Sequence, residues 1–190
     1  HYSESGKWTK PFAAHDLGTY PLANGQVYGG DMPVEESGNM LILTAAIAAV
    51  EGNADYAAKH WEVLTTWTDY LVEKGLDPEN QLCTDDFAGH FAHNTNLSIK
   101  AILGVASYGR LAEMLGKKDV AEAYTTKARQ MATEWERMAN DGDHYRLTFD
   151  KPGTWSQKYN LLWDKMHGLD IYDNKNAETE KPYYLAKKKN

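Results

Sequence analysis

Side chains that can transfer protons or bind a polar substrate concentrate in three segments of this 190-residue sequence. The first segment, residues 15–39, contains His15, Asp16, Asp31, Glu35, Glu36 and Asn39. The second, residues 83–96, contains Asp85, Asp86, His90, His93, Asn94 and Asn96. The third, residues 155–165, contains Trp155, Lys158, Trp163 and Asp164. We interpret the three segments as the mouth of a pocket, and expect its substrate-binding residues to be Asp16, Asp31, Asn39, His90, Asn94, Trp155 and Lys158.

Two pairs of adjacent carboxylates, Glu35–Glu36 and Asp85–Asp86, are the candidates for chemistry. A general acid and a general base, both carboxyl groups, cleave glycosidic bonds, with about 6.5–9.5 Å between them in inverting enzymes. Carboxylates also serve amide hydrolysis, in which one activates water and another protonates the leaving amine. The residue types alone are compatible with both reactions.

Each candidate also has a purely structural interpretation. Glu35 and Glu36 would stabilise the first turn of a helix by about 0.3–1 kcal/mol each. Asp85 and Asp86 would serve as a helix cap and a turn residue, and the histidines as ordinary loop residues. The spacing of His90 and His93 is not a specific metal signature, so the sequence predicts no metal site and no cofactor.

Composition excludes several classes of protein. The formal net charge of −7 argues against nucleic acid as a partner, because phosphate binding needs a basic patch. The single cysteine, Cys83, rules out an intrachain disulfide. No stretch approaches the roughly 20 apolar residues that a membrane-spanning helix needs. A small-molecule substrate, and neither nucleic acid nor a membrane span, is therefore expected.

The elements that position these side chains are predicted to be helices. Apolar periodicity and terminal glycines indicate helices over residues 33–52, 53–75, 97–116, 117–142 and 155–169, with a sixth beginning in 178–189. The first 32 residues are expected to be loop, and residues 143–155 a short strand and turn.

A repeat organises these helices. Gly52 and Asp55 recur as Gly116 and Asp119, and both offsets are 64 (116 − 52 and 119 − 55). In both copies a polar loop precedes an apolar helix, and an amphipathic helix follows. An apolar helix is buried on all sides, whereas an amphipathic helix faces water on one side. The pattern predicts an α/α toroid of helical hairpins, with a plain helical bundle or solenoid as the alternative.

Three long motifs carry a resemblance to a known family. They are PFAAHDLGTYPLANGQVYGGDMPVEESGNMLIL, LCTDDFAGHFAHNTNLSIKAILG and TFDKPGTWSQKYNLLWDKMHGLDIY. Together they resemble the six-hairpin domain of the glutaminase A family, over essentially the whole chain. The resemblance implies an (α/α)6 toroid, a secreted or periplasmic location in fungi or in bacteria such as Bacteroides, and hydrolysis of L-glutamine to glutamate and ammonia. The segments HDLG, MPVEESGN and CTDDFAGH match the family pattern and imply that their acids line the pocket: Asp16, Glu35, Glu36, Asp85 and Asp86.

The resemblance leads to a working hypothesis and two alternatives. In the first, Glu36 or Asp86 is the general base and Glu35 or Asp85 the general acid of an amidohydrolase. A six-hairpin glycoside hydrolase would use the same carboxylates and stack a sugar on Trp155 or Trp163. A non-catalytic ligand-binding or structural domain would show no such chemistry.

Residues 1–190 show about two and a half of the six hairpins of such a toroid. We therefore interpret them as one incomplete six-hairpin domain of a larger protein. The inner helices of an incomplete toroid expose apolar surface. We expect the remainder of the parent chain, or another copy, to cover it.

Overall fold

The computed structural model describes residues 8–84 and 89–172, and this part of the chain is helical. Its helices are α1 (Pro33–Glu51), α2 (Asp55–Lys59), α3 (Trp61–Lys74), α4 (Thr95–Met114), α5 (Lys118–Ala139), the 3-10 helix η2 (Tyr159–Leu161) and α6 (Leu162–His167). Isolated bridges, but no strands, occur among these residues. The predicted all-α class is confirmed. The helix expected in 178–189 lies outside the described residues.

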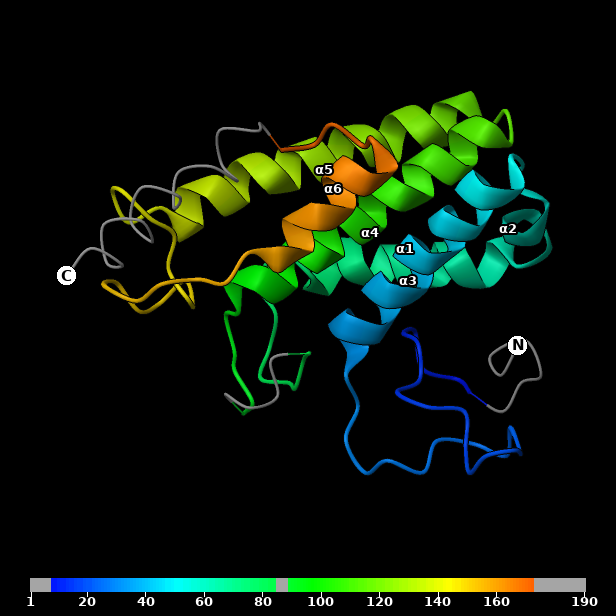
Figure 1. Ribbon diagram of the computed structural model, residues 1–190, viewed down its shortest axis with the longest axis horizontal. Coiled ribbons are helices and arrows are strands. Elements are labelled where there is room, and N and C mark those ends of the chain that lie inside the picture. Colours follow the sequence, from blue (N-terminus) through cyan, green and yellow to red (C-terminus); the bar gives the residue numbers. More distant parts are fainter. Residues whose placement is uncertain (1–7, 85–88, 173–190) are drawn as a thin grey trace.

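The helices run back and forth as hairpins (Figure 1). Helices α1, α4 and α6 point in the same direction, and α3 and α5 return in the opposite direction. The N-terminal ends of α1, α4 and α6 consequently lie toward the same side of the molecule, although the segment before α1 runs below α3 and the segment before α6 lies at the far left of the view. The described residues of the three polar segments adjoin the N-terminal ends of the helices that they precede.

Helix α4 is the centre of the packing. It contacts α1, α3 and α5, and 17 of its 20 residues are buried. Helix α5, by contrast, buries one face, on which Trp135 is fully enclosed and donates a hydrogen bond from Nε1 to the Thr95 carbonyl at 2.9 Å. An apolar inner helix and an amphipathic outer helix are therefore observed in the α4–α5 hairpin, as the periodicity predicts.

Glycines set both the turns and the helix spacing. Gly52 and Gly116, the repeated pair, have φ values of 70° and 73°, a left-handed conformation that glycine adopts without steric cost. Gly38 and Gly104 instead bring α1 and α4 together. A Cβ on Gly104 would lie 2.9 Å from Leu71 Cδ1 and 3.3 Å from Gly38 Cα.

We expect Gly104→Ala to destabilise the protein by about 1 kcal/mol, because the added methyl group displaces the Leu71 side chain and crowds the backbone of Gly38, which outweighs the better helix propensity of alanine. Denaturant unfolding of the intact protein measures this loss. Gly29→Ala is the control, since a Cβ there meets nothing within 4 Å. Equal unfolding midpoints for the two variants would contradict the close packing of α1 and α4.

Three local predictions differ from the structure. The helix expected over 53–75 is broken at His60, whose N–H bonds the Ala57 carbonyl at 3.1 Å in a tighter turn. Residues 143–155 form no regular strand, because this segment meets its neighbours only at isolated bridges. The helix expected over 155–169 begins late, since the Ser156 N–H is already bound to the Tyr145 carbonyl at 2.8 Å.

No helix in the described ranges is both long enough and apolar enough to cross a membrane.

Candidate functional site

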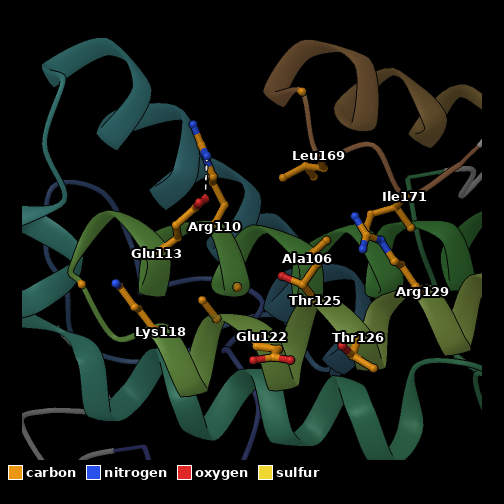
Figure 2. Close-up of a pocket in the computed structure, with 14 residues that line it drawn as sticks. Ala106, Arg110, Glu113, Lys118, Glu122, Thr125, Thr126, Arg129, Leu169 and Ile171 are labelled. Carbon is orange, nitrogen blue, oxygen red and sulfur yellow. Dashed lines mark hydrogen bonds and ion pairs between the residues drawn. The ribbon is translucent and has the colours of Figure 1, made fainter.

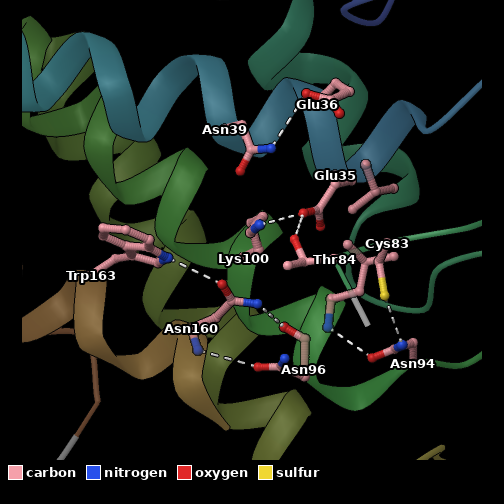
Figure 3. A network of polar contacts seen from close by, with 12 residues as sticks. Glu35, Glu36, Asn39, Cys83, Thr84, Asn94, Asn96, Lys100, Asn160 and Trp163 are labelled. Carbon is pink, nitrogen blue, oxygen red and sulfur yellow. Dashed lines mark hydrogen bonds and ion pairs between the residues drawn. The ribbon is translucent and has the colours of Figure 1, made fainter. Parts of the chain in front are cut away.

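A buried ion pair joins α1 to α4 at the end where both helices begin (Figure 3). Lys100 Nζ lies 2.6 Å from Glu35 Oε1, and the side chains are only 4% and 3% exposed. The Thr84 hydroxyl donates a second hydrogen bond to Glu35 Oε1. Gln81 ties the same loop to α1, because its Oε1 accepts a hydrogen bond from the Val34 N–H at 2.9 Å. Glu35 is therefore held in place from two elements besides its own helix.

Glu36 occupies a different environment from its neighbour. It is half-buried, and its Oε2 accepts a hydrogen bond from Asn39 Nδ2 at 3.3 Å, one turn along α1. Burial, together with the charge of Glu35, raises the pKa of Glu36, although Asn39, His15 and Lys100 oppose the shift. A carboxyl group with a raised pKa is a stronger base than an ordinary one and therefore a candidate for proton transfer.

Amide side chains connect the starts of α4 and α6. The Asn94 side chain caps α4 by accepting from the Leu97 N–H at 2.9 Å, and donates to Cys83 Sγ at 3.5 Å. Asn160 binds Asn96 twice, through its backbone N–H and through Nδ2 at 3.0 Å from the Asn96 carbonyl. Trp163 Nε1 donates to Asn160 Oδ1 at 3.1 Å. This network fixes the loops that surround Glu35 and Lys100.

Asp16 organises the N-terminal loop. Its carboxylate accepts hydrogen bonds from the backbone N–H groups of Gly18, Val27 and Tyr28, at 3.0, 2.9 and 3.0 Å, and from His15. The His15 hydrogen bond is the largest cause that lowers the pKa of Asp16 to about 2. These contacts occupy the carboxylate within its own loop.

Substitution of Asp16 by asparagine is expected to loosen residues 16–28. Because the folded-state pKa lies below the ordinary value, Asp16 stabilises the loop above about pH 4, and this contribution is lost as the pH falls toward the folded-state pKa. We expect the amide hydrogens of Gly18, Val27 and Tyr28 to exchange roughly fivefold faster or more at neutral pH. Hydrogen exchange measures this, with Asp119→Asn as the surface control. Unchanged exchange at these amides would show that Asp16 does not hold the loop.

Other predicted residues are committed to local contacts. Asp31 accepts hydrogen bonds from Lys10 and, at 3.0 Å, from Gln26 Nε2. The Trp155 ring stacks on His144 with centroids 3.8 Å apart, and Lys158 Nζ lies 4.5 Å from the Tyr145 ring centroid. One face of Trp155 is thus covered, so that face does not offer a platform for a sugar.

Only part of the second polar segment, residues 83–96, contacts Glu35 and the residues around it. His90 is exposed, and His93 turns to Asp77, at 2.8 Å, which raises the pKa of its imidazole. Asp85 and Asp86 lie outside the described residues. Among the residues that the structure does describe, no group of three or more His, Cys, Asp or Glu side chains is placed to hold a metal ion.

Sequence reasoning missed Lys100, Thr84 and Asn160. Lys100 did carry a signal, because it is the only charged residue between Asn94 and Tyr108 in an otherwise apolar and small-residue helix. A lysine buried in such a helix requires an anionic partner. Thr84 and Asn160 carry no comparable signal, since hydroxyl and amide side chains are common in loops.

A hollow of about 560 Å³ lies elsewhere, between the C-terminal half of α4, α5 and residues 168–171 (Figure 2). Its rim mixes both signs of charge, and Arg110 is paired with Glu113 at 2.6 Å. None of the three polar segments lines it. The candidate site is therefore the Glu35–Lys100 cluster with Glu36 and Asn39.

The helical hairpins agree with what a comparison to known proteins shows. Residues 1–190 match the family described as the glutaminase A six helical-hairpin domain. This chain belongs to that family. The chain is also 36% identical, over 188 residues, to the glutaminase A of Aspergillus oryzae. That similarity covers 95% of this chain and 27% of the relative.

A second relative is a protein named probable glutaminase in Arthroderma benhamiae. It is 29% identical over 223 aligned residues, which cover 85% of this chain and 26% of the relative. The chain therefore spans about a quarter of the length of the two curated relatives. Both names agree with the resemblance that the three motifs carry.

Proposed function

We propose that this chain is part of an amidohydrolase that cleaves the side-chain amide of L-glutamine to glutamate and ammonia. The observation that carries the proposal is Glu36: a half-buried carboxyl group with a raised pKa, at the end of the fold where the inner helices begin. The names of the two fungal relatives support the choice of an amide over a glycan.

In this proposal the two adjacent glutamates, Glu35 and Glu36, have different roles. Glu36 removes a proton from water as the water oxygen attacks the amide carbon. Glu35, paired with Lys100, stays in place as a fixed charge and does not itself react. The C–N bond then breaks, and the departing nitrogen takes a proton from an acid, for which Asp85 and Asp86 are the candidates. Asn39 orients Glu36 through its amide.

Ammonia release from L-glutamine by the intact protein tests the proposal. We expect release from glutamine at a rate well above that from asparagine, and no reducing sugar from a panel of plant and microbial glycans. Release of sugar without ammonia would replace the proposal with a glycosidase. Binding of glutamine without turnover would indicate a non-catalytic domain.

A further inference from the structure

A cavity of about 220 Å³, which we call the α1–α3 cavity, lies between the N-terminal loop, α1 and the α2–α3 segment. Each of these elements contributes to its walls, among them Ala13 and Leu17 from the loop, Met40 and Thr44 from α1, and Val63 and Trp67 from α3. Ala13 and Thr44 are buried, whereas Leu17 is 49% exposed, so the cavity is enclosed on one side and reaches solvent on the other. A protein cavity of about 150 Å³ holds one benzene ring. The α1–α3 cavity is therefore large enough for an aromatic ring with a short linking group.

The lining of the α1–α3 cavity favours an uncharged group with one hydrogen-bond acceptor. Among the described residues, no Asp, Glu, Lys or Arg side chain lines the cavity, and His60 is the lining residue that can carry a charge. The Thr44 hydroxyl already donates a hydrogen bond to the Met40 carbonyl at 2.7 Å. Trp67 Nε1, by contrast, is buried and has no hydrogen-bond partner in the described ranges. A buried donor without an acceptor is unfavourable, so a ligand carbonyl near Trp67 would be stabilised.

The α1–α3 cavity adjoins the candidate site. Glu36, Met40 and Thr44 follow one another at intervals of four residues, so they lie on one side of α1. Met40 and Thr44 line the cavity, and Glu36 lies one helical turn before them. On the opposite wall, the Ala13 N–H donates a hydrogen bond to Oγ of Ser37, the residue after Glu36, at 3.1 Å. A substrate whose amide lies at Glu36 can therefore extend into the cavity.

We propose that the α1–α3 cavity is a subsite for an uncharged acyl group on the α-amino nitrogen of a glutamine substrate, and that the acyl carbonyl accepts a hydrogen bond from Trp67 Nε1. This inference rests on the proposed function. The substrate class is an Nα-acylated glutamine with an aromatic or branched acyl group.

The chemistry of the substrate favours the α-amino nitrogen as the point of attachment. Free glutamine carries a charged α-ammonium group, which apolar walls do not stabilise. Acylation removes this charge and supplies the carbonyl acceptor that Trp67 lacks. The α-nitrogen is four bonds from the reacting carbon, a span of roughly 5 Å, and the turn of α1 between Glu36 and the cavity rises by about 5.4 Å. The acyl group would therefore begin where the cavity begins.

Ammonia release by the intact protein from Nα-benzyloxycarbonyl-L-glutamine and from L-glutamine tests the proposal. We expect kcat/KM to be about tenfold or more higher for the acylated substrate, because its aromatic ring moves from water into the cavity. Val63→Phe fills the cavity from α3 and should lower the ratio of the two kcat/KM values about tenfold. Thr66→Phe, at an exposed position of the same helix, is the control and should leave this ratio unchanged. Trp67→Phe removes the indole N–H and should lower the ratio about three- to tenfold.

Equal kcat/KM values for the acylated and the free substrate would overturn the proposal. A preference that survives both Val63→Phe and Trp67→Phe would also overturn it, since the acyl group would then bind elsewhere. A third substrate, L-glutamine with a benzyl group on the side-chain amide nitrogen, tests the other point of attachment. Faster hydrolysis of this substrate than of the Nα-acylated one would assign the cavity to the leaving group and contradict the proposal.

A binding measurement separates failure of the subsite from failure of the proposed function. If no substrate releases ammonia, the proposed function is wrong, and benzyl carbamate, the uncharged acyl group alone, tests the cavity by ligand-observed NMR titration. We expect benzyl carbamate to bind the intact protein and to bind the Val63→Phe variant at least tenfold more weakly. Absence of binding, or equal binding to the variant, would overturn the subsite.

Discussion

Replacement of Lys100 by methionine is expected to lower the unfolding free energy of the intact protein by about 3–5 kcal/mol. The substitution keeps most of the volume of the lysine stem and removes the ammonium group. Glu35 then remains as a buried charge, only 3% exposed, with the Thr84 hydroxyl as its remaining side-chain partner in the described chain. An unpaired buried carboxylate is far more costly than a paired one.

The double variant Lys100→Met with Glu35→Gln distinguishes two contributions to the loss of stability. One is the loss of the ion pair itself, and the other is the burial of an unpaired carboxylate. Because an apolar or neutral replacement of a buried ion pair is often nearly neutral, the double variant should recover most of the stability that the single variant loses. Arg137→Met is the matched control. It breaks an ion pair of similar length with Glu134 on the surface of α5, which is worth about 0–1 kcal/mol. A loss for Lys100→Met no larger than that of the control would show that the pair is not buried in the intact protein.

Glu36→Gln should reduce the turnover of glutamine by about 100-fold or more, because the amide has nearly the shape of the carboxyl group but does not accept the proton of the attacking water. Glu51→Gln, at the opposite end of α1 and exposed, is the control and should leave turnover unchanged. Steady-state ammonia release measures both. Full turnover in the Glu36 variant would remove this residue from the mechanism.

The same variant is expected to be more stable than the parent at neutral pH. The raised pKa means that folded Glu36 still holds its proton where the unfolded chain has released it, so stability falls as the pH rises above the ordinary glutamate pKa of 4.5. Glutamine does not titrate, so the variant lacks this decline. Denaturant unfolding at about pH 4 and about pH 7 measures the difference. A variant that is less stable than the parent at both pH values would contradict the unfavourable burial of the charge.

Local signals in the sequence determined the helices and their order. Pro33 begins α1, and Gly75 follows the last residue of α3. Gly52 and Gly116 follow the apolar helices in a left-handed conformation. The positions of these residues in the sequence predict all of these helix ends. The periodicity distinguished the buried α4 from the amphipathic α5. These features depend on contacts between residues a few positions apart, so they are readable from a single chain.

Tertiary structure alone decided which of the adjacent glutamates is buried in an ion pair. Glu35 and Glu36 are chemically identical and differ in direction by about 100° around α1. The close contact of Gly38 with Gly104 sets how α1 sits on α4, and this turns Glu35 toward Lys100, 65 residues away, and Glu36 away from it. The same is true of Asp16 and Asn94, which the loop geometry commits to backbone N–H groups. Residue type and spacing suggested a candidate site, but the rotation of one helix against another decided which way its side chains point. That rotation depends on contacts between residues distant in the sequence.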